Sequence, residues 1–319
     1  MLFCLACLAP TACRGQGCCT VGSSSLGGLE SGVQRFETLT VGLNYQFNSV
    51  TQAFQERRRI DDPLRRTASV SYLTVQLEYG LARSVSLLAS LHYSDKSREI
   101  TVLAGTGGTA FQETASFRGS GIGDLTVLAK YQVIEPTIIS PFELAIGGGA
   151  SLPTGSFTQE QNGSQLSIDL QPGTGAPSLI GWVFALRSFP SLGLTVSLAT
   201  QYRYSGTNFD GYRIGDEIVV NAGGEYQLMM FLRGALYIRA RFAEQDYANR
   251  RVLNATGGTY YDFMPGLTYA DGPSAVRVFA QLPLYRNVRG IQLALSYLLG
   301  VEYRYTVDFR TLAGGVSPL

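Results

Sequence analysis

Cysteine is absent from residues 20–319 of this 319-residue chain. All five cysteines lie in the first 19 residues: Cys4, Cys7, Cys13, Cys18 and Cys19. A body without cysteine excludes disulfides and cysteine-ligated metal from that body. Histidine is almost absent too, since His92 is the only one, which argues further against a metal site. Charged residues make up only 15% of the chain and the net charge is +1, so nothing favours a nucleic-acid partner.

Long apolar runs are also missing. No stretch of about 18 apolar residues occurs, so we expect no membrane-spanning helix. The N-terminal MLFCLACLAPTA is a short apolar run that ends in small residues, like the core of a secretory signal peptide, but it lacks the usual positive charge. We expect an atypical signal peptide over residues 1–17 and a Cys/Ser/Gly-rich segment over residues 18–35. Three roles stay open for Cys18 and Cys19: a disulfide-linked disordered end, a lipid anchor, or metal capture.

The rest of the chain repeats one design, in which apolar and polar residues alternate for about ten positions. In TLTVGLNYQF, the apolar residues Leu39, Val41 and Leu43 share one face of an extended strand with Tyr45 and Phe47. Successive side chains of a strand point to opposite faces, so the polar residues between them share the other face. About twelve such segments follow one another, which predicts an all-β fold.

The connections between these segments alternate in length. Short links such as LARS, FPSLG and ADGPS follow every second strand, whereas the others are mostly longer, as at residues 51–66, 95–118 and 153–175. Transmembrane β-barrels have short periplasmic turns and long extracellular loops. The pattern predicts an antiparallel transmembrane β-barrel of about twelve strands over residues 36–309, with a C-terminal tail over residues 310–319.

The two faces of the strands favour a barrel in lipid over a soluble one. The last strand has an apolar face, expected to meet lipid: Ile291, Leu293, Leu295, Tyr297, Leu299, Val301, Tyr303 and Tyr305. A soluble barrel would pack such a face inward and carry Lys and Glu outside. Tyrosines cluster at strand ends, where an aromatic girdle meets the membrane interface. We therefore expect a location in a bacterial outer membrane, with lipid as a partner.

One glycine-rich stretch invites a different interpretation. GSGIGDLTVLAKYQV, residues 119–133, places glycines at alternate positions, as dinucleotide-binding loops do. Those loops need a helix after the glycines, because the helix N-terminus holds the pyrophosphate. Here an alternating strand follows, so we expect no nucleotide and no other cofactor.

The same stretch, followed by ELAIGGGASLPTG, resembles the outer-membrane channel family associated with the meta pathway of phenol degradation. The residues that carry the resemblance are Gly121, Gly123, Asp124, Lys130 and Tyr131, then Leu152, Pro153, Thr154 and Gly155. It implies a channel for passive uptake or export of small, often hydrophobic or aromatic molecules. In the last strand, GVEYRY, with Gly300, Tyr303 and Tyr305, is similar to the C-terminal signal recognised by the barrel-assembly machinery, which implies that machinery as a partner.

The candidate permeant-contacting residues are charges that the alternation turns toward the lumen: Lys130, Arg187, Arg203, Arg233, Arg239, Arg241, Glu78, Asp124, Glu225 and Glu302. Their near balance favours cross-lumen ion pairs that brace a narrow interior. The alternative is a local arginine ladder at Arg239 and Arg241 that attracts anions.

Two other functions remain open. A barrel that conducts nothing could act as a structural or interaction scaffold through its longer loops. A barrel lipase would need a His–Ser pair with a polar partner. His92 is expected to face the lumen beside Ser90 and Ser94, whereas barrel lipases place that pair on the lipid face, so a non-enzymatic channel is favoured.

Overall fold

The computed structural model describes residues 30–62, 64–104 and 111–313. The predicted signal peptide, all five cysteines and the last residues of the predicted tail lie outside these ranges. Twelve long strands form the body: β1 (Thr38–Val50), β4 (Thr67–Ala82), β5 (Val85–Ala104), β7 (Leu125–Ile134), β8 (Phe142–Leu152), β11 (Ser178–Phe189), β12 (Leu194–Ser205), β14 (Glu217–Met229), β15 (Leu232–Ala243), β18 (Gly258–Asp271), β19 (Ser274–Ala294) and β20 (Tyr297–Asp308).

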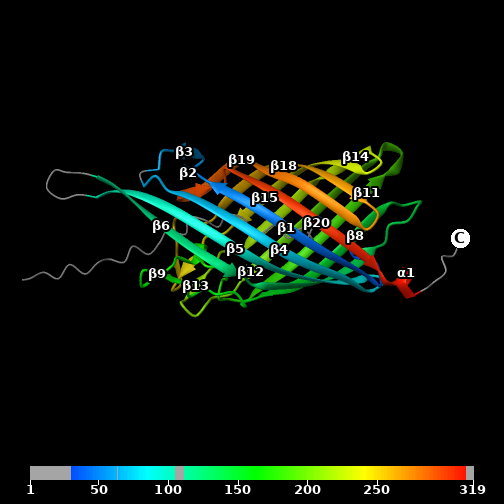
Figure 1. The fold of residues 1–319 in the computed structure, drawn as a ribbon, viewed down its shortest axis with the longest axis horizontal. Helices are drawn as coiled ribbons and strands as arrows, with labels where there is room; N and C mark the ends of the chain where they lie inside the picture. Colours follow the sequence, from blue (N-terminus) through cyan, green and yellow to red (C-terminus); the bar gives the residue numbers. More distant parts are fainter. Residues whose placement is uncertain (1–29, 63, 105–110, 314–319) are drawn as a thin grey trace, which may run out of the picture.

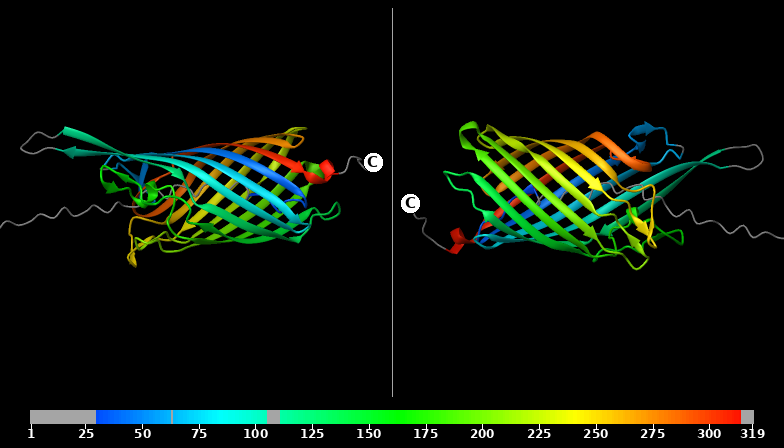
Figure 2. Two further views of the ribbon diagram at one scale, coloured as in Figure 1. Left: turned by 60° about the horizontal axis from the view of Figure 1, so that its bottom comes forward. Right: turned by 180° about the vertical axis from the view of Figure 1, so that it is seen from behind.

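These strands close into one barrel (Figures 1 and 2). Each pairs antiparallel with the long strands before and after it, and β20 returns to pair with β1, where Asp308 lies opposite Thr38. The predicted fold, an all-β antiparallel barrel of twelve strands, is confirmed. No helix among the described residues is long and apolar enough to cross a membrane.

The connections divide by length between the two ends of the barrel, as predicted. The long-loop end lies at the left of Figure 1, where β6 (Phe111–Ile122) pairs with the outer part of β5. The same end carries the short elements β2 (Gln52–Glu56), β3 (Arg58–Ile60), β9 (Glu160–Gln161), β10 (Ser164–Gln165), η2 (Ile168–Leu170), β13 (Tyr212–Arg213), β16 (Tyr247–Ala248) and β17 (Arg251–Val252). The short-turn end carries η3 (Pro190–Leu192) and α1 (Phe309–Ala313).

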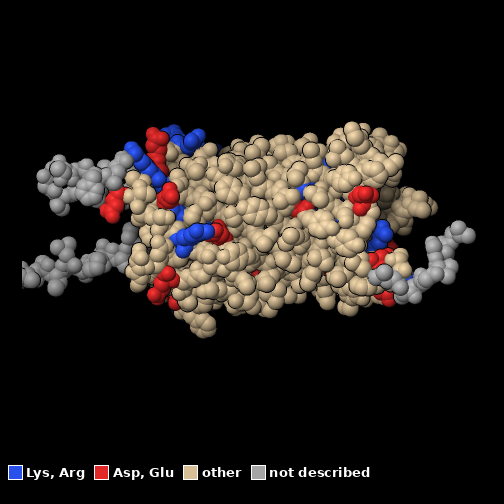
Figure 3. Space-filling view, in the orientation of Figure 1, with Lys and Arg blue, Asp and Glu red and all other residues tan. Residues whose placement is uncertain are grey.

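The outer surface is apolar between the two ends. Leu43, Leu77 and Val301 are exposed on neighbouring strands, with 41–45% of each side chain accessible. Figure 3 shows charged residues gathered toward the ends of the barrel and few between them. Exposed tyrosines lie near the short-turn end at Tyr131 and near the long-loop end at Tyr202. A water-soluble barrel would bury these side chains, so this surface is suited to lipid.

The prediction that the apolar face of the last strand meets lipid along its whole length is wrong for the first residues of that face. Leu293 and Leu295 are 4% and 9% exposed, and they pack inside the barrel against Val50 and Met264. The reason is that β19 stays paired with β20 only up to Gln281, and its later residues pair with β2 instead. This part of the chain therefore folds into the lumen and is apolar because it is buried.

A second apolar cluster also lies on the inner wall. It consists of Leu88, Leu128, Ala145, Ile180, Trp182, Phe184 and Ala199, and the Trp182 and Phe184 rings stack at 5.7 Å between centroids. Trp182 and Phe184 occupy the inner face of β11, so the odd-numbered residues of this strand point outward. Arg187, predicted to point inward, is consequently exposed on the outer face, where its guanidinium lies over the Phe189 ring.

Candidate functional site

Ion pairs line the inner wall of the barrel. Arg203 and Arg241 both approach Glu217, at 3.7 and 3.0 Å. These residues lie on neighbouring strands, so the pairs run along the wall. The prediction that such pairs cross the lumen is wrong for these residues. Arg239 is buried beside them, at 4% exposed. The inner wall is braced by charge, and the predicted anion-attracting pair Arg239 and Arg241 is packed into it.

Lys130 lies at the centre of a buried ion pair. Its side chain is fully buried, and its Nζ donates to Glu78 Oε1 at 2.9 Å, reaching across β5 from β7 to β4. The same Nζ lies 5.0 Å from the centroid of the Trp182 ring. It also donates to the backbone carbonyls of Ser31 and Gly32, both at 3.1 Å. Lys130 therefore joins the wall to the chain that precedes β1.

That preceding chain, residues 30–37, is called here the N-terminal segment, and its first part, residues 30–34, lies inside the barrel. Glu30 Oε2 accepts from Arg277 Nη1 at 2.8 Å, and the Val33 amide donates to Glu143 Oε1 at 3.1 Å. A Cβ added at Gly32 would overlap the Glu143 carboxylate, so the backbone passes close to this side chain of the wall. No pattern in the sequence indicated this placement, since residues 18–35 were expected only to form a Cys/Ser/Gly-rich segment.

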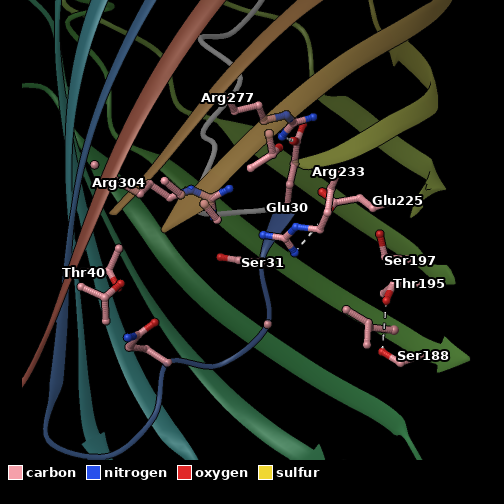
Figure 4. Close-up of a pocket in the computed structure, with 18 of the residues that line it drawn as sticks. Glu30, Ser31, Thr40, Ser188, Thr195, Ser197, Glu225, Arg233, Arg277 and Arg304 are labelled. Atoms are coloured by element: carbon pink, nitrogen blue, oxygen red, sulfur yellow. Dashed lines mark hydrogen bonds and ion pairs between the residues drawn. The ribbon is translucent and has the colours of Figure 1, made fainter. Parts of the chain in front are cut away.

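The lumen opens into a cavity of about 820 Å³, called here the vestibule, which is lined by residues of the short-turn end such as Pro190 and Pro273. Figure 4 shows Arg233 with Glu225, and Arg277 with Glu30, among the residues that line it. Arg304 also lines the vestibule and approaches Glu302 at 3.3 Å. Hydroxyls of the wall and apolar groups such as Phe184 share the lining. The vestibule offers both charged and apolar contacts to a small molecule.

At the opposite end, residues 153–177, called here the inner loop, fold inward. Asp124, predicted to contact permeant, is buried and holds this loop: it accepts from the Gly155 amide at 3.0 Å, the Thr174 amide at 2.9 Å and Thr174 Oγ1 at 2.7 Å. Lys96 Nζ, on the inner face of β5, donates to the Gln171 carbonyl at 2.7 Å. The inner loop therefore narrows the lumen at the long-loop end.

The two halves of the glycine-rich family motif meet where Asp124 holds the inner loop. Besides the contact of Asp124 with Gly155, the Leu125 amide donates to Thr154 Oγ1 at 2.9 Å. A Cβ added at Gly123 would overlap the His92 ring, so glycine is required there for close packing. The motif thus fastens a loop.

His92 faces inward, as predicted, with Ser90 and Ser94 buried on the same face of β5. Its ring packs edge-on against Tyr72, with 5.6 Å between centroids. This packing gives His92 a structural role beneath the inner loop. Within the ranges that the structure describes, no group of three or more His, Cys, Asp or Glu side chains could hold a metal ion.

The predicted lumen residues fall into five places. Lys130, Glu78 and Glu302 lie buried at mid-wall, and Arg203, Arg239 and Arg241 surround Glu217 nearer the long-loop end. Arg233 and Glu225 meet in the vestibule, 3.3 Å apart, and Asp124 anchors the inner loop. Arg187 alone lies on the outer face. Glu30 was missed, because no local pattern marks a residue whose partner lies 247 positions away.

Comparison with known proteins agrees with this architecture. A family profile described as "Putative MetA-pathway of phenol degradation" matches residues 40–273. The structure is similar to that of an outer membrane channel from Pseudomonas putida F1, with a TM-score of 0.65 and 13% identity over 88% of this chain and 98% of that chain. It is more distantly similar to a Pseudomonas aeruginosa FadL homologue (TM-score 0.41, 9% identity, 85% and 90% covered) and to the Ralstonia pickettii toluene transporter TbuX (TM-score 0.40, 11% identity, 86% and 90% covered). A search of the curated proteins finds no significant match.

Proposed function

Since the chain belongs to this phenol-degradation family, as its glycine-rich motif predicted, we propose that it is a channel for passive uptake or export of small molecules, apolar or aromatic ones among them. It is a β-barrel of the outer membrane. The proposal places the short-turn end in the periplasm and the long-loop end outside the cell, as in other barrels of this kind.

The observation that carries the proposal is the vestibule. A cavity of about 820 Å³ inside a closed barrel is large enough for a single-ring compound, and pockets for small molecules are commonly of this size. Its lining mixes arginines and hydroxyls with Leu88, Phe184 and Leu186. Such a surface suits a molecule with an apolar body and a polar group.

A second candidate is a barrel that conducts nothing and acts as a scaffold. The observation in its favour is that two parts of the chain occupy the lumen: the N-terminal segment, tied to Lys130 and Arg277, and the inner loop, tied to Asp124. Both reduce the space open to a permeant. The two candidates therefore differ in whether these contacts break under working conditions.

Bilayer conductance and liposome swelling distinguish the two candidates. We expect the purified full chain to give discrete conductance steps in KCl, and to admit small sugars into liposomes at rates that fall with solute size. The matched control is the same protein unfolded by heat before reconstitution. A folded barrel that gives no conductance at any voltage, even when Asp124 is replaced by alanine, would identify it as a scaffold.

Ion selectivity is expected to depend on Arg233 and not on Arg239. The Arg233 side chain is 41% exposed in the vestibule, whereas Arg239 is buried in the wall. Charges that face a pore select permeant ions, so Arg233→Gln should shift the reversal potential in a KCl gradient toward cation preference. Arg239→Gln should leave that potential unchanged. Arg187→Gln, on the outer face, is the matched control, and an equal shift there would contradict the assignment.

A further inference from the structure

Arg277 differs from the other arginines of the vestibule in the origin of its partner. Arg233 pairs with Glu225 and Arg304 with Glu302, all four on strands of the barrel. In the described part of the chain, the ion-pair partner of Arg277 is Glu30, at 2.8 Å. Glu30 belongs to the N-terminal segment, which forms no part of the wall. Glu302 lies opposite Arg277 on β20 but pairs with Arg304, so among the described residues Glu30 is the carboxylate within ion-pair distance of Arg277.

The surroundings of Arg277 suit a carboxylate ligand. The guanidinium carbon lies 5.8 Å from the centroid of the Tyr237 ring and 5.3 Å from that of Phe279, so the cation is held between aromatic rings. Arg277 itself is 6% exposed, and its Nε is buried without a hydrogen-bond partner. A guanidinium can bind a carboxylate through two parallel hydrogen bonds, which is the strongest pairing that an arginine makes.

We propose that Arg277, with Tyr237 and Phe279, forms a binding site for the carboxylate of small aromatic or apolar acids, and that Glu30 occupies this site as a tethered carboxylate. The inference rests on the proposed channel function and names a class of permeant for it. An incoming acid displaces Glu30 from Arg277. Its apolar body then lies along the part of the vestibule lined by Leu88, Phe184 and Leu186.

Access to the site is from the vestibule, which Arg277 and Glu30 both line. Figure 4 shows the Glu30 side chain directed at Arg277 from the segment that enters the vestibule. Displacing Glu30 also weakens one of the contacts that hold the N-terminal segment in the lumen. Binding of an acid and withdrawal of the segment are thus coupled, because both require the same ion pair to break.

Benzoate binding to the full chain in detergent micelles, measured by titration calorimetry, tests the inference. A tethered competitor lowers apparent affinity by the fraction of time that it fills the site. Glu30→Gln should therefore tighten benzoate binding about tenfold. Adding Arg277→Gln to that variant should abolish the gain. Benzyl alcohol, which has the same ring without the carboxylate, should bind Glu30→Gln and the unaltered chain equally.

The matched control is Glu37→Gln, which removes the same charge from the same segment away from Arg277. Folding of each variant is checked by the electrophoretic shift of the unheated barrel, and a second readout is the protection by benzoate against urea, which should be larger for Glu30→Gln. Equal benzoate affinity in Glu30→Gln and the unaltered chain, or an equal gain from Glu37→Gln, would overturn the inference. Tighter benzoate binding by a barrel that conducts nothing would support the site and refute the channel. Conductance by a barrel whose benzoate affinity does not change in Glu30→Gln would support the channel and refute the site.

Discussion

Replacing Asp124 by alanine is expected to raise the open probability of single channels in planar bilayers by on the order of 100-fold. The carboxylate accepts three hydrogen bonds from Gly155 and Thr174, and it is only 5% exposed. Hydrogen bonds to a charged group each contribute about 1.5–3 kcal/mol when buried, so the inner loop loses about 3 kcal/mol or more of its attachment. Lys96 and Arg98 still hold the loop through Gln171 and Asp169, so the loop leaves the lumen more often but keeps part of its attachment.

The control for Asp124→Ala is Asp95→Ala. Asp95 also lies near the long-loop end and also pairs with an arginine, since Arg118 Nη2 lies 2.5 Å from its Oδ2. That pair is on the outer side of β5, where both partners are partly exposed, and exposed ion pairs contribute little. Channel opening should therefore be unchanged in Asp95→Ala. If Asp124→Ala conducts no more than the unaltered chain, the inner loop is not the barrier to passage.

Replacing Lys130 by methionine is expected to destabilise the folded barrel by about 3–5 kcal/mol, because it strands the buried carboxylate of Glu78. Lys130 is fully buried, and after its removal Glu78 keeps only weaker donors such as Ser86 Oγ, at 3.0 Å. Equilibrium unfolding in urea measures the loss. The sole tryptophan, Trp182, lies beside Lys130 and reports the transition by fluorescence.

The double variant Lys130→Met/Glu78→Leu separates two explanations of that loss. If the cost comes from an unpaired buried charge, removing both charges should recover most of the stability. If the double variant is as unstable as Lys130→Met, the loss comes from the contacts of Lys130 with Ser31 and Gly32. In that case the N-terminal segment contributes to barrel stability more than the ion pair does.

The number of strands and most of their faces could be predicted from the sequence for a physical reason. Lipid on one side of each strand forces a period of two, which is visible in any window of ten residues. Leu125, Val127 and Tyr131 of β7 follow this period and lie with their apolar side chains on the outer half of the wall. The links alternate between short and long, and this alternation predicts which end of each strand lies at the short-turn end of the barrel.

The same reasoning failed where apolar residues point inward. It assumes that the lumen is wet along its whole length, whereas Trp182 and Phe184 fill part of it. Arg187, in the same strand as these rings, was therefore assigned to the wrong face. Leu293 and Leu295 were misplaced for a related reason, because their strand leaves the wall and lies in the lumen. Neither the apolar inner face of β11 nor the departure of β19 from the wall changes the local alternation of apolar and polar residues. Only long-range contacts reveal these two features.

The pairing of β1 with β20 has a consequence for biosynthesis. Thr38 lies opposite Asp308, and the register continues without a break to Ser49 opposite Tyr297. The nascent chain therefore cannot close its sheet until nearly all of its residues have been made, and until then the first strand presents a free row of backbone donors and acceptors. Such an edge readily adds a strand from another chain, and contacts so distant in sequence form slowly. Premature termination before residue 297 should accordingly yield aggregating or degraded products instead of a smaller barrel.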